Sequence, residues 1–103
     1  MFTLMAVLEI AVEPIGEGVH MSDAIARALA ILDDAKVEYE LTQMGTVVRG
    51  EIKDLFELAR QMHEAARRGS SRVLTIIRID DRGADADLLR KERGESVETD
   101  RAA

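Results

Sequence analysis

The stretch YELTQMGTVVRG, residues 39–50, decides the fold of this chain. Two short runs of β-type residues flank the pair Met44-Gly45, and a helical pattern begins directly after Gly50. Gly45 can adopt a positive φ in a tight turn at little steric cost. The stretch therefore predicts a β-hairpin that turns at Met44-Gly45 and leads straight into a helix.

Periodic apolar residues on both sides of the hairpin predict the remaining elements. Alternation over residues 3–13 predicts a first strand, and alternation over residues 72–81 predicts a last one. Apolar residues at helical spacing predict one helix from about Ser22 to residues 35–36 and another from Gly50 to about residue 68. Ser22 is a good N-cap for the first helix, and we expect Arg27 of that helix to face water.

The predicted order of elements is strand, helix, strand, strand, helix, strand. Right-handed crossovers place both helices on the same side of the sheet. We therefore predict an α+β fold, a ferredoxin-like βαββαβ sandwich with a four-stranded antiparallel sheet and two helices on one face. We expect residues 1–82 to form this domain and residues 83–103 to form a charged C-terminal extension that is partly helical or mobile.

The face of the sheet that carries no helix, here called the open face, is expected to decide the function. Among its residues are Val7, Glu9, Ala11 and Glu13 of the first strand, Thr46 and Val48 of the third, and Leu74, Ile76, Arg78 and Asp80 of the last. This face is too apolar for bare solvent and too charged for a dry core. Pairing of subunits across it, or along an edge strand, would cover the apolar part and could leave polar pockets between the chains.

Composition restricts the class of partner and the compartment. The net charge of −6 over 103 residues argues against nucleic-acid binding, which needs a cationic surface to displace counterions. It favours a neutral or cationic small ligand, although solubility alone would also explain an acidic surface. No apolar run approaches the length of a membrane span, so we expect no membrane partner. The absence of cysteine fits a reducing interior, and we expect the protein to be cytoplasmic.

Glycine and histidine residues are the next candidates for a site. Gly16-Glu17-Gly18 opens a helix and could cradle an anion, but it lacks the further glycine of a dinucleotide fingerprint and the lysine of a P-loop, which favours a plain turn. His20 lies in a loop that enters a helix, a common place for a ligand wall. His63 is expected on the flank of a helix. We predict no metal site, because the sequence displays no carboxylates at metal-binding spacing beside the two histidines.

Charged residues of the open face form a candidate polar cluster. Glu9 and Glu13 point the same way, and Arg78 and Asp80 come from the expected antiparallel neighbour. Two interpretations remain open: a cluster that holds an amino-substituted ring or a cation, and an ion-pair network between subunits. Neighbouring carboxylates can perform acid–base chemistry, but the sequence supplies no nucleophile with an orienting base. We therefore predict that the protein is not an enzyme and uses no cofactor.

Several segments together resemble the small thiamine-binding protein family, whose members are single ferredoxin-like domains. The matching segments are Glu9 with residues 14–18, residues 39–42 with 44–46, residues 63–65, residues 72–73 and residues 77–82. They follow the family's order over nearly the whole chain to about residue 82, and the hairpin and the segment Ile79-Asp80-Asp81-Arg82 are the most specific. Three positions depart from the family pattern, in which Pro is usual at Gln43, an acidic residue at Arg49 and a small hydroxyl residue at His20.

The resemblance implies assembly into dimers and tetramers and non-catalytic binding of thiamine or its pyrimidine portion. Thiamine carries a fixed positive charge and an aminopyrimidine, so carboxylates could accept hydrogen bonds and balance the charge, while Met44 packs against the flat rings. The expected ligand-binding residues are Glu9, Glu13, Gly18, His20, Ser22, Met44, Thr46, Arg78 and Asp80. The alternative function is a structural or regulatory oligomerisation module with no small-molecule ligand.

Overall fold

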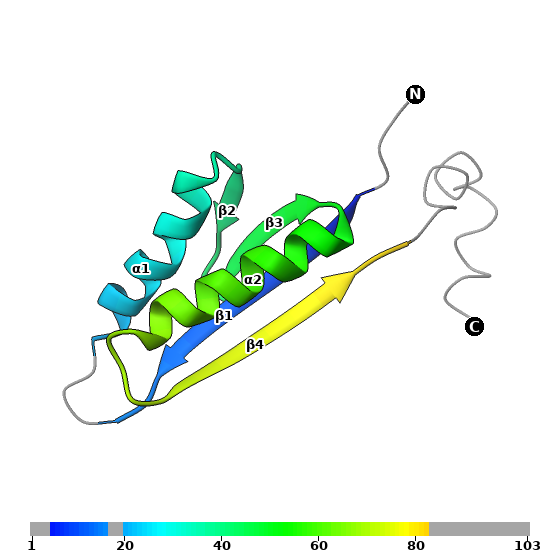
Figure 1. Ribbon diagram of the computed structural model, residues 1–103. Coiled ribbons are helices and arrows are strands. Elements are labelled where there is room, and N and C mark those ends of the chain that lie inside the picture. Colours follow the sequence, from blue (N-terminus) through cyan, green and yellow to red (C-terminus); the bar gives the residue numbers. More distant parts are fainter. Residues whose placement is uncertain (1–4, 17–19, 83–103) are drawn as a thin grey trace, which may run out of the picture.

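The computed structural model describes residues 5–16 and 20–82, which form one sheet covered by two helices (Figure 1). The elements in chain order are β1 (Ala6–Pro14), α1 (Met21–Asp34), β2 (Tyr39–Leu41), β3 (Thr46–Gly50), α2 (Ile52–Arg67) and β4 (Val73–Asp80). The strands lie in the order β2-β3-β1-β4, and every neighbouring pair is antiparallel. This is the ferredoxin-like fold that the order of elements predicted. The predicted extension, residues 83–103, lies outside the described residues.

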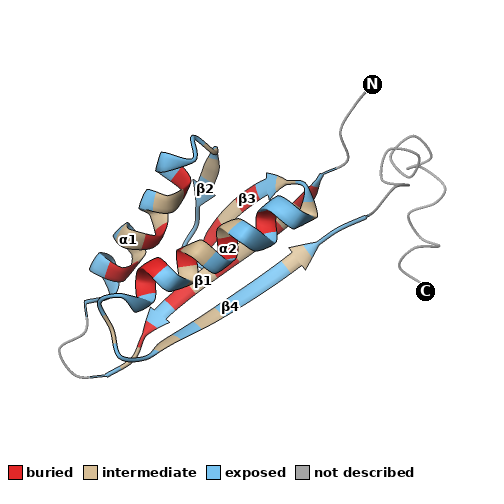
Figure 2. Ribbon diagram, viewed as in Figure 1, coloured by how far each residue is buried: buried red, intermediate tan, exposed pale blue. Residues whose placement is uncertain are grey.

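The core forms between the two helices and the inner face of β1. Leu8 of β1, Leu32 of α1 and Leu55 of α2 are each at most 1% exposed. Burying a leucine side chain contributes about 1.5–3 kcal/mol relative to leaving it in water, so these contacts hold the helices on the sheet. β4 is mostly exposed by comparison (Figure 2), because it is an edge strand and its outward face carries no helix.

The hairpin turns one residue earlier than predicted. Thr42 and Gly45 are joined by two main-chain hydrogen bonds of 2.9 and 3.4 Å, so Gln43 and Met44 form the tip. The hydroxyl of Thr42 accepts hydrogen bonds from the N–H groups of Met44 and Gly45, at 3.0 and 3.1 Å. Gly45 has a φ of +156°, and a Cβ at this position would lie 2.8 Å from the carbonyl oxygen of Ile10. Glycine is therefore required because two backbones approach closely here.

The register of β3 corrects a second expectation. Thr46 and Val48 pair with Ile10 and Leu8 of β1 and face the helices, with 6% and 2% of their surfaces exposed. The prediction that they lie on the open face is wrong, because side chains alternate along a strand and an offset of one residue reverses every one of them. Val47 takes the open face instead, opposite the side of β3 that meets the core.

Two details of α1 differ from the prediction. The N-cap is His20, which makes no side-chain cap hydrogen bond, so Ser22 lies inside the first turn and does not cap the helix. Arg27 does not face water, because its guanidinium donates to the carbonyl oxygens of Ala65 and Ala66 in α2, at 3.0 Å each. A cation at the C-terminal end of a helix also complements the helix dipole. Arg27 therefore joins α1 to α2.

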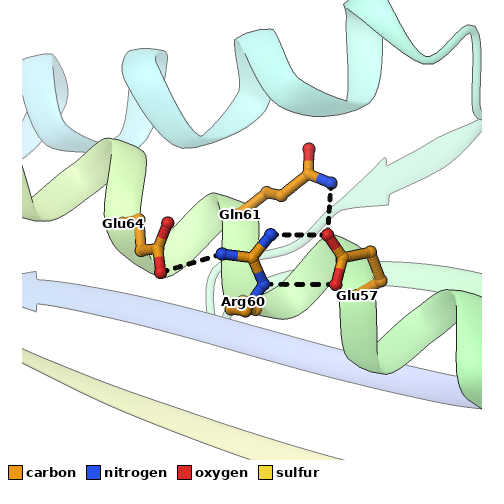
Figure 3. Close-up of polar contacts among 4 residues, drawn as sticks. All are labelled: Glu57, Arg60, Gln61 and Glu64. Carbon is orange, nitrogen blue, oxygen red and sulfur yellow. Dashed lines mark hydrogen bonds and ion pairs between the residues drawn. The ribbon is translucent and has the colours of Figure 1, made fainter.

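The solvent side of α2 carries a network of ion pairs and hydrogen bonds (Figure 3). Arg60 contacts Glu57 at 2.6 Å and Glu64 at 2.9 Å, and the Gln61 amide donates to Glu57 at 2.8 Å. The hydrogen bonds from Arg60 and then Gln61 lower the pKa of Glu57 to about 2. All four side chains come from adjacent turns of one helix and line neither of the cavities described below. The network therefore supports the helix locally.

Candidate functional site

β1 continues past the end of β3, and this difference in length leaves part of one edge of β1 without a neighbouring strand among the described residues. β3 pairs with β1 from Ala6 to Ile10, whereas β4 pairs with β1 from Val7 to Pro14. Beyond Ile10, β1 therefore has a strand partner only on the β4 side within the described ranges. Residues of α1 and of the hairpin tip border the space on the other side.

This space is a cavity of about 450 Å³, which we call the hairpin pocket. Its walls include Val12 and Glu13 of β1, Ile25 and Leu29 of α1, and Met44 and Thr46 of the hairpin. The volume lies in the range of small-molecule sites, and aliphatic walls suit a flat ring better than a hydrated ion. Met44 is 75% exposed at the rim, where a ligand would cover it.

Two of the polar side chains that border the hairpin pocket lie in different surroundings. Thr46 is 6% exposed, the sole buried polar residue of the described chain, and its hydroxyl has no hydrogen-bond partner among those residues. Glu13 is exposed on the open-face side of β1. A buried hydroxyl costs free energy unless water or a ligand bonds to it. Thr46 therefore marks a buried polar point among the aliphatic walls of the cavity.

A second and more open cavity of about 390 Å³ lies on the open face, and we call it the open-face groove. Its lining residues are Val7, Glu9, Val47, Arg78, Ile79 and Asp80. Glu9 and Arg78 are direct partners across β1 and β4, and the Nε of Arg78 lies 3.2 Å from Oε1 of Glu9. Because this pair balances its own charge, Asp80 carries the remaining negative charge of the groove.

The structure separates the predicted ligand-binding residues into two groups. Glu13, Met44 and Thr46 line the hairpin pocket. Glu9, Arg78 and Asp80 line the open-face groove. Glu9 and Glu13 point the same way from β1, but β3 ends between them, so they border different cavities.

The remaining predicted residues and family departures fall as follows. His20 and Ser22 are exposed at the start of α1 and line neither cavity, and Gly18 lies outside the described residues. Gln43 borders the hairpin pocket at the hairpin tip. Arg49 lies on the open face, 3.7 Å from an acidic side chain of β2. Of the departures that the structure describes, Gln43 is therefore the one that can alter the hairpin pocket directly.

Reasoning from sequence missed the α1 wall of the pocket. Ile25 and Leu29 have the spacing of core residues, and both are in fact half-buried and border the cavity. The available signal was the unequal length of the predicted strands, because a long strand beside a short one must leave part of its edge uncovered.

Other kinds of site receive no support in the part of the chain that the structure describes. No group of three or more His, Cys, Asp or Glu residues there could hold a metal ion. His63 bonds through Nδ1 to the hydroxyl of Thr75 and so links α2 to β4. Gly16 has a φ of +131°, which suits a turn, and the rest of the Gly16–Gly18 loop is not described. Within residues 5–16 and 20–82, no helix has both the length and the apolar character needed to cross a membrane.

Comparison with known families identifies the chain. The sequence profile of a family described as thiamine-binding protein matches residues 8–98. The chain belongs to this family. The match contains both walls that β1 and the hairpin contribute to the hairpin pocket, and it continues beyond residue 82.

Relatives of this thiamine-binding family member occur in bacteria and archaea. A UPF0045 protein of Staphylococcus xylosus is 42% identical over 84 residues, which cover 76% of this chain and 78% of that protein. A UPF0045 protein of Methanothermobacter thermautotrophicus is 38% identical over 96 residues, which cover 90% of this chain and 96% of that protein. These identities extend over most of both chains, so the relatives share the whole domain.

Solved structures agree with the fold. A domain of unknown function, DUF77, from Bacillus cereus superposes with a TM-score of 0.72 at 21% identity, covering 79% of each chain. A protein of Thermotoga maritima, whose name assigns it provisionally to thiamine biosynthesis or salvage, superposes with a TM-score of 0.66 at 18% identity. That likeness covers 84% of this chain and 98% of the other. At such identities these likenesses support the fold alone.

Proposed function

We propose that this protein binds thiamine, or a related cationic aminopyrimidine, in the hairpin pocket and releases it unchanged. The observation that carries the proposal is the position of residues 44–46. They belong to one of the two segments whose resemblance to the thiamine-binding family is most specific, and they form one wall of a cavity of about 450 Å³ with aliphatic walls. The residues that carry the sequence resemblance are therefore also residues that line the cavity.

The chemistry of the pocket matches the two halves of thiamine. The aliphatic walls offer flat contact surfaces for the rings, and the flexible thioether of Met44 can adapt to them. Glu13 supplies a negative charge for the cationic thiazolium ring. Glu13 is also the sole ionisable side chain among the described residues that line the pocket, so the pocket offers no nucleophile paired with a base. This inventory supports a binding role without turnover.

Calorimetry with thiamine, its phosphates and hydroxymethylpyrimidine tests the proposal. Absence of both heat and thermal shift with all of these ligands would reject the ligand assignment. Glu13→Gln and Glu9→Gln form a matched pair, because both residues lie on the same face of β1 and Glu13 alone lines the hairpin pocket. We expect Glu13→Gln to weaken thiamine binding about tenfold and Glu9→Gln to change it less than about twofold. The reverse pattern would place the ligand in the open-face groove.

We further propose that the chain self-associates as a dimer or tetramer through the open face. Leu74 of β4 is 45% exposed and Ile76 is 52% exposed, beside the ion pair of Glu9 and Arg78. An apolar sheet face of this kind is typical of an interface between subunits. Sedimentation velocity should detect an oligomer that Leu74→Lys dissociates. A wild-type monomer at every concentration tested would contradict the proposal.

A further inference from the structure

The main-chain groups of Val12 face the hairpin pocket. In an antiparallel ladder the N–H and C=O of one residue point to the same side, and the side alternates along the strand. The N–H of Ile15 donates to the carbonyl of Arg72 at 3.0 Å, so the odd-numbered residues of β1 point toward β4. The carbonyl oxygen of Ile10 lies beside Gly45, so the even-numbered residues point toward β3. Val12 therefore directs its N–H and C=O to the side where β3 has ended.

The hairpin tip turns away from Val12. A continued ladder would place Met44 opposite Val12, but the ladder stops at the pair Ile10 and Thr46. The N–H of Met44 donates to the hydroxyl of Thr42 at 3.0 Å instead. Among the described residues, one donor and one acceptor of β1 are thus left open to the pocket. Because Val12 is 9% exposed, bulk water has little access to them.

The hydroxyl of Thr46 adds a third polar group to the same wall. Thr46 pairs with Ile10, and Val12 lies two residues further along β1, so both side chains are on the helix side of the sheet. Both residues line the hairpin pocket, and the Thr46 hydroxyl has no partner among the described residues. The wall therefore presents a polar edge beneath aliphatic surfaces.

We infer that this edge of β1 determines the specificity of the pocket. Its main-chain groups form with an aminopyrimidine the hydrogen bonds that they would otherwise form with a neighbouring strand. The N–H of Val12 donates to a ring nitrogen, and its C=O accepts from the adjacent amino group. The hydroxyl of Thr46 bonds to a further polar atom of the ring. A 4-oxo pyrimidine places N–H against N–H and C=O against C=O, so the same edge rejects it. The inference rests on the proposed function for the place of the ligand and names the chemical feature that is recognised there.

Calorimetry with paired ligands tests the inference separately from the proposed function. The probes are thiamine, its 4-oxo analogue oxythiamine, hydroxymethylpyrimidine and the 4-oxo analogue of that pyrimidine. We expect each amino compound to bind about 100-fold more tightly than its oxo partner, because two mismatched polar pairs are buried. Equal affinities within the pairs would overturn the inference and leave the proposed function standing. Binding of hydroxymethylpyrimidine but not of thiamine would overturn the proposed function and leave the inference standing. Binding of no aminopyrimidine would overturn both the inference and the proposed function.

Hydrogen exchange gives a direct readout at the main chain. We expect exchange of the Val12 amide to slow when thiamine saturates the protein, because its N–H becomes bonded to the ligand. The Ala11 amide, which points toward β4, serves as the internal control and should not change. Unchanged exchange of the Val12 amide at saturation would overturn the inference.

Two substitutions isolate the hydroxyl of Thr46. Thr46→Val keeps the branched shape and removes the hydroxyl, and we expect it to weaken thiamine binding about tenfold. Thr46→Ser keeps the hydroxyl, and its affinity should stay within about threefold of the wild type. Equal losses in the two variants would show that Thr46 only packs against the ligand and would remove it from the recognised edge.

Discussion

Replacing Gly45 with alanine tests the contact that closes the hairpin onto β1. The added Cβ would lie 2.8 Å from the carbonyl oxygen and 3.2 Å from the carbonyl carbon of Ile10. Both atoms belong to the backbone of the central strand, so the hairpin has to move. The φ of +156° is also one that L residues rarely adopt. Backbone strain and overpacking each cost about 1–3 kcal/mol, so we expect the free energy of unfolding to fall by about 2–6 kcal/mol.

Gly50→Ala is the matched control for this prediction. Gly50 ends β3, the strand that Gly45 directly precedes, and its added Cβ would meet Cδ2 of Leu55 at 3.5 Å, an ordinary contact. We expect this change to alter the free energy of unfolding by less than about 0.5 kcal/mol. Urea unfolding followed by circular dichroism would compare the two variants, and each 1 kcal/mol lost should lower Tm by about 4–8 °C. Equal stability of Gly45→Ala and Gly50→Ala would refute the reasoning about close approach.

The remaining predictions concern the two helices. Arg27→Met should lower the free energy of unfolding by about 1–3 kcal/mol, because two carbonyl groups of α2 lose their donor. Gly69→Ala should act through the same contact, since its Cβ would lie 2.5 Å from the Arg27 guanidinium. In urea unfolding, the double variant should therefore lose less stability than the sum of the losses in the two single variants. Fully additive losses would contradict this. The Arg60 hydrogen bond lowers the pKa of Glu57 from 4.5 to about 2, so its contribution to stability is present above pH 4.5 and is lost as the pH falls through about 2. Glu57→Gln should reduce the loss of the free energy of unfolding between pH 4.5 and about 2. The same loss of stability in the variant and the wild type would contradict this prediction.

The layers of the fold could be predicted from sequence because they depend on local periodicity. Alternation in β1 and helical spacing in α1 and α2 are properties of neighbouring residues, and the order of elements then restricts the topology. The position of the turn was misplaced by one residue for a physical reason. In a sequence, a glycine that permits a turn cannot be distinguished from a glycine that permits a close approach to another strand. The short distance between Gly45 and the Ile10 backbone shows that Gly45 permits a close approach.

The candidate site was harder to predict, because it depends on where strands end. Glu9 and Glu13 share one face by alternation, but the end of β3 assigns them to different cavities. The open edge at Val12 is formed by the N–H and C=O of the main chain, so it cannot be predicted from the type of residue at that position. Met44 and Thr46 border the same cavity, because a hairpin brings them together locally.

The place of β4 in the sheet has a consequence for synthesis of the protein. Val7, near the start of β1, lies directly opposite Asp80, at the end of β4. A chain emerging from the ribosome can pair β1 with the hairpin early, but the other edge of β1 stays open until β4 has been made. Pairing between such distant segments is slow, and an open apolar edge can capture strands of other chains in the meantime. A nascent chain that stalls before residue 73 would thus be the form most in need of a chaperone.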